Sequence, residues 1–306
     1  MLFVDRLCDA TLRKKSRLVV GLDPILDLIP AELLPSGDRY DREAASSAVE
    51  QFQIAVLDAV ADYAVAVKPQ MAFYERLGPR GLAALENVVS LANDRGLLVI
   101  CDCKRGDIGS TAVAYADYYL GSREAGDHLP GLGADSVTVN PYLGADSLAP
   151  FAAHIKRGCG LFILAKTSNP GSADLQDRLI EGETSMPLYQ SVATLADSIA
   201  DQYPLGEYGY SSIGLVVGAT FPQQAVALRQ AFPRLPFLIP GVGTQGGKVQ
   251  DIRDCFDGRG LGAVINASRS ILFAYRENGA PTNWKDAARR AAAAQRDEIN
   301  QALNLS

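Results

Sequence analysis

Histidine and cysteine, the usual ligands of zinc, are scarce in this chain of 306 residues. It has two histidines and five cysteines, and no two cysteines form a C-x-x-C pair. His128 and His154 lie far apart in the sequence, which argues against a zinc site. An odd number of cysteines with mostly apolar neighbours argues against a disulfide framework and indicates reduced, buried thiols. We therefore expect a cytoplasmic protein without a bound metal.

Three further features are missing. No apolar run approaches the roughly 20 residues of a membrane-spanning helix. No basic block stands out, and the net charge of −6 disfavours nucleic acid as a partner. Residues 1–15 carry charges throughout, which is not the pattern of a signal peptide. We expect neither a membrane nor a nucleic acid to be a partner.

Short apolar runs recur along the chain, and segments with helical periodicity separate them. Runs of this length without polar alternation are typical of strands that are covered on both faces. The eight runs are residues 18–22, 64–67, 97–100, 136–139, 161–165, 213–217, 237–239 and 263–265. The helical segments are residues 44–63, 82–93, 148–156, 188–202 and 223–230.

Buried strands that alternate with helices predict parallel pairing through right-handed crossovers. Eight such units fit a single (β/α)8 TIM barrel over residues 1–306, closed by a C-terminal helix at residues 283–303. The alternative is a doubly wound open sheet, which usually has a Gly-rich turn after its first strand. The first strand here ends Gly21-Leu-Asp-Pro24, without the G-x-G-x-x-G pattern, so the barrel is favoured.

Polar or glycine-rich chemistry follows every predicted strand. Active sites of barrels lie at the C-terminal ends of the strands. Ordinary turn composition explains any one of these ends, but it is a weaker explanation for all of them together. The strand ends carry Asp23, Lys68, Asp102 with Lys104, Asn140, residues 166–168, Thr220, residues 241–245 and residues 266–269.

The end of the third strand carries an acid and a base. Side chains of a strand alternate between its faces, so Asp102 and Lys104 point the same way. Lys68 ends the neighbouring second strand and should lie beside Asp102, and Asp107 could extend this alternating line. Lysines between carboxylates are held protonated, which suits a proton donor and not a Schiff-base nucleophile. A surface ion pair is the plain alternative for this stretch.

Two loops at the far side of the predicted barrel favour a phosphate. Residues 241–247 are rich in glycine and follow the seventh strand, and residues 266–270 follow the eighth and open a helix at 268–276. Barrels often bind phosphate with backbone amides at this place. Arg269 can add a bidentate contact, and Gln245 can reach over the anion. After the fifth strand, the polar segment 168–186 favours a lid over an uninvolved surface insertion.

These motifs together resemble the orotidine 5'-phosphate decarboxylase family, cofactor-free barrels that make UMP. The similarity is greatest to the longer branch found in some bacteria, and it spans about residues 18–273. The matching positions are Asp102, Lys104, Asp107, Ile108 and Thr111 in one motif, and residues 22–24, 68–74, 166–171, 240–245 and 268–269 elsewhere.

The resemblance implies roles for the charged residues. Lys104 would give a proton to C6 of the pyrimidine, and Asp102 would face the substrate carboxylate. Lys68 would bind ribose hydroxyls and hold Asp102 charged. Asp107 would reach into the site of a partner subunit, which implies a homodimer with shared active sites. No metal or organic cofactor is implied.

The same resemblance implies the residues that bind the substrate. Asp23 would bind ribose, Ser168 would contact the pyrimidine edge, Ile108 and Thr111 would cross to the partner with Asp107, and Pro240, Gln245, Ser268 and Arg269 would hold the phosphate. Two alternatives stay open. One is a Mg2+-dependent sugar-phosphate decarboxylase or aldolase of the same superfamily, which would need an acidic cluster. The other is a barrel that binds a nucleotide phosphate without catalysis.

Overall fold

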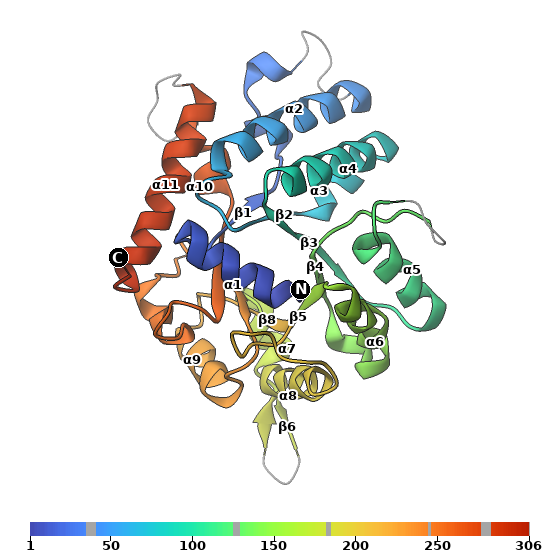
Figure 1. The fold of residues 1–306 in the computed structure, drawn as a ribbon, viewed down its shortest axis with the longest axis vertical. Helices are drawn as coiled ribbons and strands as arrows, with labels where there is room; N and C mark the ends of the chain where they lie inside the picture. Colours follow the sequence, from blue (N-terminus) through green and yellow to red (C-terminus); the bar gives the residue numbers. More distant parts are fainter. Residues whose placement is uncertain (35–40, 125–128, 182–184, 244–245, 277–282, 306) are drawn as a thin grey trace.

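Eight parallel strands close into a barrel in the computed structural model of this protein (Figure 1). The structure describes residues 1–34, 41–124, 129–181, 185–243, 246–276 and 283–305. Around the barrel the strands are β1 (Leu18–Leu22), β2 (Ala66–Pro69), β3 (Leu98–Arg105), β4 (Ser136–Val139), β5 (Gly160–Lys166), β8 (Ile213–Val217), β9 (Phe237–Ile239) and β10 (Ala263–Ala267), and β10 pairs with β1 to close the circle. The predicted barrel is confirmed.

Helices surround the strands (Figure 1). They are α1 (Phe3–Lys14), α2 (Arg42–Val60), α3 (Met71–Glu75), α4 (Pro79–Asp94), α5 (Gly109–Leu120), α6 (Ala145–Ala153), α7 (Ala173–Gln176), α8 (Leu188–Ala200), α9 (Pro222–Ala231), α10 (Arg269–Leu272) and α11 (Trp284–Ala302). The 3-10 turns are η1 (Leu26–Leu28), η2 (Ala31–Leu33), η3 (Pro141–Leu143), η4 (His154–Arg157), η5 (Pro170–Ser172), η6 (Gln250–Cys255) and η7 (Ala274–Arg276).

Local sequence signals set several helix ends. Asp41 caps α2, since its carboxylate accepts hydrogen bonds from the backbone N–H groups of the first turn. Pro79 begins α4, where a missing N–H costs nothing. Asn283 caps α11, which packs against α2 and α10, and Trp284 and Phe273 both lie against Phe52 there. This helix is the one that we predicted at residues 283–303.

The alternation of side chains along the strands divides the apolar core into two layers. Leu18, Val20 and Leu22 of β1 face the surrounding helices, whereas Val19 belongs to the cluster that fills the barrel. In β3, Ile100 lies in this inner cluster, so Asp102 two residues later also faces the barrel interior. On β2 and β3 the inner face therefore changes from the apolar Ala66 and Ile100 to the charged Lys68 and Asp102 toward the C-terminal ends of the strands.

Helix α1 closes the opposite end of the barrel and was not predicted. Its Phe3, Leu7 and Ala10 belong to the inner cluster, and the Phe3 ring meets Phe162 of β5 edge to face at 6.0 Å. Figure 1 shows α1 lying across the barrel. Residues 1–15 showed only their charges in the sequence, because the apolar residues that seal the barrel alternate with charged residues, one of which, Asp5, is itself buried and accepts from the Glu207 N–H.

Several predicted boundaries were wrong. Strand β2 begins two residues later than expected, so Lys68 lies within it. Strand β3 continues through Asp102 and Lys104, where we expected it to end. The helix predicted at 268–276 is interrupted, with α10 followed by the separate turn η7. Helix α5 was not predicted.

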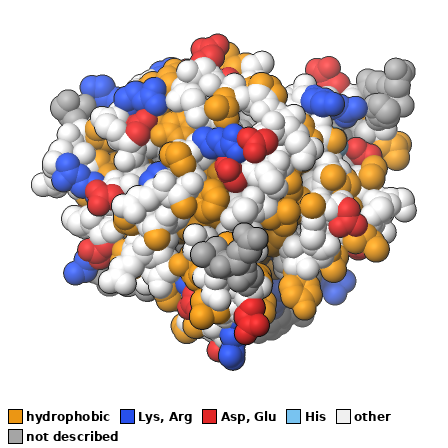
Figure 2. Space-filling model, turned by 90° about the horizontal axis from the view of Figure 1, so that it is seen from below, with side chains coloured by type: hydrophobic (Ala, Val, Ile, Leu, Met, Phe, Trp, Pro, Cys, Tyr) orange, Lys and Arg blue, Asp and Glu red, His pale blue; other side chains and the backbone are white. Residues whose placement is uncertain are grey.

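The segment after β5, which we predicted as a lid, has secondary structure of its own. It contains η5, α7 and a small antiparallel pair formed by β6 (Leu179–Ile180) and β7 (Met186–Pro187). The pair projects from the barrel beyond α8 (Figure 1). The face that carries it mixes acidic and basic side chains without a large field of one sign in this view (Figure 2).

No helix among the described residues is long and apolar enough to cross a membrane.

Candidate active site

A cavity of about 480 Å3 opens at the C-terminal ends of the barrel strands. All eight strands, or the loops that follow them, contribute to its wall. The lining residues are Asp23, Lys68, Gln70, Asp102, Lys104, Thr138, Leu164, Thr167, Ser168, Asn169, Gln176, Val216, Leu238, Pro240, Gly241, Val242, Asn266, Ala267, Ser268, Arg269 and Ser270. The cavity lies where the polar strand ends predicted a site.

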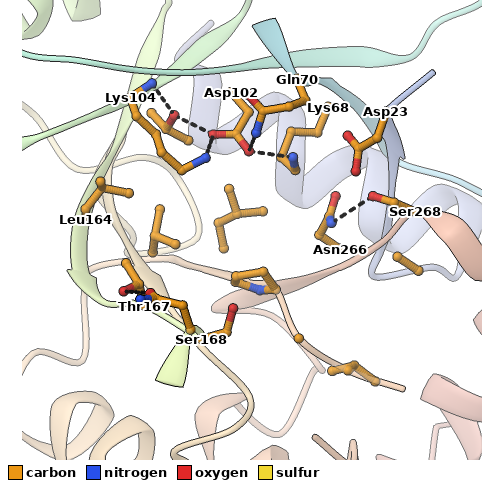
Figure 3. Close-up of a pocket in the computed structure, with 18 of the residues that line it drawn as sticks. Asp23, Lys68, Gln70, Asp102, Lys104, Leu164, Thr167, Ser168, Asn266 and Ser268 are labelled. Carbon is orange, nitrogen blue, oxygen red and sulfur yellow. Dashed lines mark hydrogen bonds and ion pairs between the residues drawn. The ribbon is translucent and has the colours of Figure 1, made fainter. Parts of the chain in front are cut away.

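One wall of the cavity is charged and another is apolar. The charged wall comes from β2 and β3, and the apolar wall comes from Leu164, Val216 and Leu238 on β5, β8 and β9. Figure 3 shows Leu164 across the cavity from Lys68. A flat ring with one charged edge would find matching surroundings in such a space.

Asp102 lies between two ammonium groups. Its Oδ2 is 2.6 Å from Lys68 Nζ, and its Oδ1 is 2.6 Å from Lys104 Nζ. The side chains of Lys68 and Asp102 are almost fully buried, whereas 45% of the Lys104 side chain is exposed toward the cavity. The alternating line that we expected from the strand ends is present for these three residues (Figure 3).

The two lysines set the charge of Asp102. Burial alone would raise the pKa of this carboxyl, but Lys68 and Lys104 outweigh burial and hold the pKa well below its usual range. Burial alone would lower the pKa of Lys68, and the charge of Asp102, with a smaller effect of Asp23, raises it instead. Both groups of this buried pair are therefore ionised at neutral pH.

Two neutral side chains complete the surroundings of Asp102 and were not among our predicted site residues. Gln70 Nε2 donates to Asp102 Oδ2 at 3.1 Å, and Thr138 Oγ1 donates to Oδ1 at 2.9 Å. With four donors on two oxygens, the carboxylate is held firmly. The alternation rule could have found Gln70, because it follows Lys68 by two residues.

The backbone at Lys104 departs from a regular strand. Its φ is 46°, in the left-handed region, and the pairing of β3 with β4 shifts register between Cys101 and Arg105. Lysine has no special tolerance for this conformation, which costs about 1–2 kcal/mol. The N–H of Lys104 donates to Thr138 Oγ1 at 3.0 Å, which holds the turn in place. Lys104 reaches Asp102 through this irregularity and not through simple alternation.

Asp107, Ile108 and Thr111 do not line the cavity of their own chain. Asp107 Oδ1 accepts a hydrogen bond from the Ile108 N–H at the start of α5. Ile108 is 55% exposed, and Thr111 is exposed as well. The charged line within one chain therefore runs from Lys68 to Lys104 and does not include Asp107.

The predicted phosphate end is formed by the loops after β9 and β10. Pro240, Ser268 and Arg269 line the cavity there. Gly241 has a φ of 93°, which a residue with a side chain rarely adopts, so the sharp turn after β9 depends on glycine. Gln245 lies outside the described residues. Asp23 lines the cavity at the end of β1.

A buried ion pair between Lys166 and Asp177 holds the loop after β5. Lys166 is fully buried, and its Nζ lies 2.7 Å from Asp177 Oδ1 and 4.1 Å from the centre of the Phe221 ring. Gln176 next to this pair accepts from the Thr167 N–H at 2.9 Å and donates to Thr167 Oγ1 at 2.8 Å. Ser168, which we predicted as a contact to the pyrimidine, lines the cavity beside Thr167.

Comparison with known proteins places these features in a family. The model of the orotidine 5'-phosphate decarboxylase / HUMPS family matches residues 16–280. The chain belongs to this family.

Curated relatives in the family match over nearly their whole length. Orotidine 5'-phosphate decarboxylase of Rhodopirellula baltica is 46% identical over 305 residues, which cover 98% of this chain and 99% of that one. The enzyme of the same name from Deinococcus radiodurans is 39% identical over 304 residues, covering 99% and 98%. The family that the motifs predicted is confirmed.

Solved structures agree with the family assignment. OMP decarboxylase of Leishmania donovani superposes with a TM-score of 0.74 at 32% identity, and the match covers 100% of both chains. A crystal structure from Toxoplasma gondii gives a TM-score of 0.82 at 30% identity, covering 99% of this chain and 96% of that one. Both solved structures therefore share the overall fold of this chain over nearly its whole length.

The name of the family model joins orotidine 5'-phosphate decarboxylase with HUMPS, so membership alone does not decide between the activities considered above. The Mg2+-dependent alternative would need a cluster of acidic side chains. Across the described residues, no group of three or more His, Cys, Asp or Glu side chains is arranged to hold a metal ion. Glu75, beyond the end of β2, forms an ion pair with Arg105 outside the cavity. The carboxylates that line the cavity in the described part of the chain are Asp23 and Asp102.

Proposed function

We propose that this chain decarboxylates orotidine 5'-phosphate to UMP and CO2. The observation that carries the proposal is the buried Asp102 carboxylate held between two ammonium groups at 2.6 Å, on the wall of a cavity whose other side is apolar. The name carried by the relatives at 46% and 39% identity supports the same reaction.

The proposed chemistry uses Asp102 and Lys104. The substrate carboxylate at C6 would lie against ionised Asp102, and the repulsion would be relieved as neutral CO2 departs. The bond between C6 and the carboxyl carbon breaks, and its electron pair stays on C6. The Lys104 ammonium stabilises this carbanion and then gives it a proton, so that UMP forms. Lys104 is left neutral and regains a proton from solvent, to which 45% of its side chain is exposed.

Binding of the remote groups would supply energy for this step. Lys68 and Asp23 would hold the ribose, and Ser168 would contact the pyrimidine edge. The phosphate would bind at the opposite end of the cavity, between Arg269 and the loop after β9. We assign Pro240, Ser268 and Gln245 to this phosphate end as well.

We further propose that the active unit is a homodimer and that residues 1–306 act as one domain. Asp107 is half-buried at the start of α5, outside the cavity of its own chain, and its neighbour Ile108 exposes an apolar side chain. In a dimer, Asp107, Ile108 and Thr111 would enter the partner's site and extend the line of charges. Helices α1 and α11, at the two ends of the chain, both pack on the barrel, which supports one domain. A cytoplasmic location stays a prediction.

The direct test is a spectrophotometric assay with orotidine 5'-phosphate. We expect the wild type to consume it and Lys104→Ala to lose nearly all activity. Treatment with EDTA should leave the rate unchanged, whereas inactivation would favour the Mg2+-dependent alternative. If the wild type bound UMP but did not decarboxylate orotidine 5'-phosphate, the result would favour the alternative of a barrel that binds a nucleotide phosphate without catalysis.

The shared site has its own test. Asp107→Ala and Lys104→Ala subunits, each inactive alone, should recover part of the activity when mixed, because one site of the hybrid dimer keeps both residues. Two different affinity tags, one on each variant, allow tandem purification to show that the subunits exchange. Exchange without recovery would mean that Asp107 serves its own chain.

A further inference from the structure

One polar side chain on the inner wall of the barrel has no role in the assignments above. Asn266 lies on β10 two residues after Val264, which belongs to the inner core, so its side chain faces the barrel interior. It lines the cavity together with the apolar Leu238 of the neighbouring strand β9. A carboxamide at such a place needs hydrogen-bond partners, because burying it without them costs free energy.

Asn266 has an unused acceptor. Its Oδ1 is buried and has no hydrogen-bond partner among the described residues, and its Nδ2 makes one long contact of 3.5 Å with Ser268 Oγ. Asp23 Oδ1 is also buried without a partner in the described part of the chain. Figure 3 draws Asp23, Asn266 and Ser268 at the same end of the cavity. These two oxygen atoms can each accept a hydrogen bond from a ligand in the cavity.

The chain makes room for this arrangement at Gly21. A Cβ atom on Gly21 would lie 1.9 Å from Ser268 Oγ and 3.2 Å from Asn266 Oδ1. A side chain at residue 21 would force the Ser268 side chain to move, so the observed close approach of these two residues depends on glycine. The bare backbone of Gly21 on β1, the Asn266 side chain on β10 and the Ser268 side chain just after β10 form one corner of the cavity.

The position of this corner indicates its ligand. It lies between the charged wall, where the proposed function puts the pyrimidine, and the loops after β9 and β10, where it puts the phosphate. The sugar of a nucleotide must span that interval, and its hydroxyl groups are hydrogen-bond donors. We propose that Asn266 Oδ1 accepts a hydrogen bond from a ribose hydroxyl, beside Asp23, and so contributes to the selection of ribonucleotides over deoxynucleotides. This inference rests on the proposed function.

The test measures selectivity. Calorimetry would give the affinities of UMP, 2'-deoxy-UMP and 3'-deoxy-UMP for the wild type and for Asn266→Leu. We expect the wild type to prefer UMP, and we expect Asn266→Leu to reduce that preference about three- to tenfold for at least one analogue, as the loss of one hydrogen bond implies. Asn266→Ala repeats the measurement should the larger side chain disturb folding.

Asn140→Leu is the matched control. Asn140 also follows a strand, but its side chain accepts from the Tyr142 N–H and does not line the cavity. In Asn140→Leu, the affinity of UMP relative to 2'-deoxy-UMP and relative to 3'-deoxy-UMP should stay within about twofold of the wild type, since this substitution removes no hydrogen bond to a ligand. An equal loss of affinity for all three nucleotides in Asn266→Leu, or no change, would overturn the inference. A wild type that does not bind UMP at all would instead contradict the proposed function.

Discussion

Replacing Asp102 by Asn should destabilise the fold as well as stop catalysis. Lys68 is almost fully buried, and the Asp102 carboxylate is the acceptor 2.6 Å from its Nζ. Removing one partner of a buried ion pair costs about 3–5 kcal/mol, because the other charge stays behind. The asparagine oxygen still accepts a hydrogen bond and the charge of Asp23 acts on Lys68, so we expect a loss of about 2–4 kcal/mol at pH 7.

The protonation of Lys68 sets an upper limit to this loss. A lysine with an ordinary pKa of about 10.4 can escape burial by losing its proton, which at pH 7 costs about 4–5 kcal/mol. In the Asp102→Asn variant, the pKa of Lys68 should be lower in the folded state than in the unfolded state. Such a lysine destabilises the fold at every pH below its unfolded-state pKa. The penalty then shrinks as the pH rises toward 10. In the wild type the pKa of Lys68 is raised, so its contribution persists over the same range.

Urea unfolding followed by circular dichroism at pH 7 and pH 10 measures both effects. The difference in unfolding free energy between wild type and Asp102→Asn should be clear at pH 7 and smaller at pH 10. Glu43→Gln is the control, since the side chains of Glu43 and of its ion-pair partner Arg80 are both largely exposed and we expect a change below about 1 kcal/mol. The reasoning would be refuted if Asp102→Asn were at least as stable as the wild type at pH 7. It would also be refuted if the difference in unfolding free energy between the two proteins were as large at pH 10 as at pH 7.

Three further outcomes are expected. Lowering the pH of the wild type through the depressed pKa of Asp102 should remove the stability that this carboxylate contributes at neutral pH, and Asp102→Asn should lack that part of the acid transition in a pH titration followed by circular dichroism. Asp177→Asn should cost about 1–3 kcal/mol in urea unfolding, because Lys166 is fully buried, and Lys166→Met with Asp177→Asn should recover part of this loss. Arg269→Ala should weaken the binding of UMP about 10- to 100-fold in calorimetry while leaving that of uridine nearly unchanged, since a charge-assisted contact to phosphate is lost.

Much of the site followed from two rules applied to the sequence. Buried strands alternating with helices predicted the barrel, and the rule that barrel sites lie at strand ends then brought Asp23, Lys68 and Asp102 into one cavity. These are properties of the whole fold, so errors of two residues in a strand boundary did not matter. Helix α1 was missed for a related reason, because its function in the fold depends on the open end of a barrel and not on any local signal.

Contacts that depend on loops were beyond such rules. The two rules alone do not predict that the chain turns at the end of β3 and carries Asp107, Ile108 and Thr111 out of the cavity, although the resemblance to the family implied that these residues serve a partner subunit. Gln176 comes from the segment that we treated only as a lid, and it reaches Thr167 because the buried pair of Lys166 fixes the next residue along the chain. Neither arrangement follows from the periodicity of apolar residues, on which the two rules depend.

Lys104 shows why a correct contact can have an unforeseen geometry. Alternation predicts that Asp102 and Lys104 share a face, but the strand shifts register there and Lys104 adopts a φ of 46°. A conformation that costs about 1–2 kcal/mol persists only where neighbouring contacts determine it. Here the Lys104 N–H is bound by Thr138 Oγ1 and its Nζ by Asp102, while Thr138 itself donates to Asp102. The same three hydrogen bonds that hold the strain also aim the ammonium group, so the turn and the proposed proton donor depend on each other.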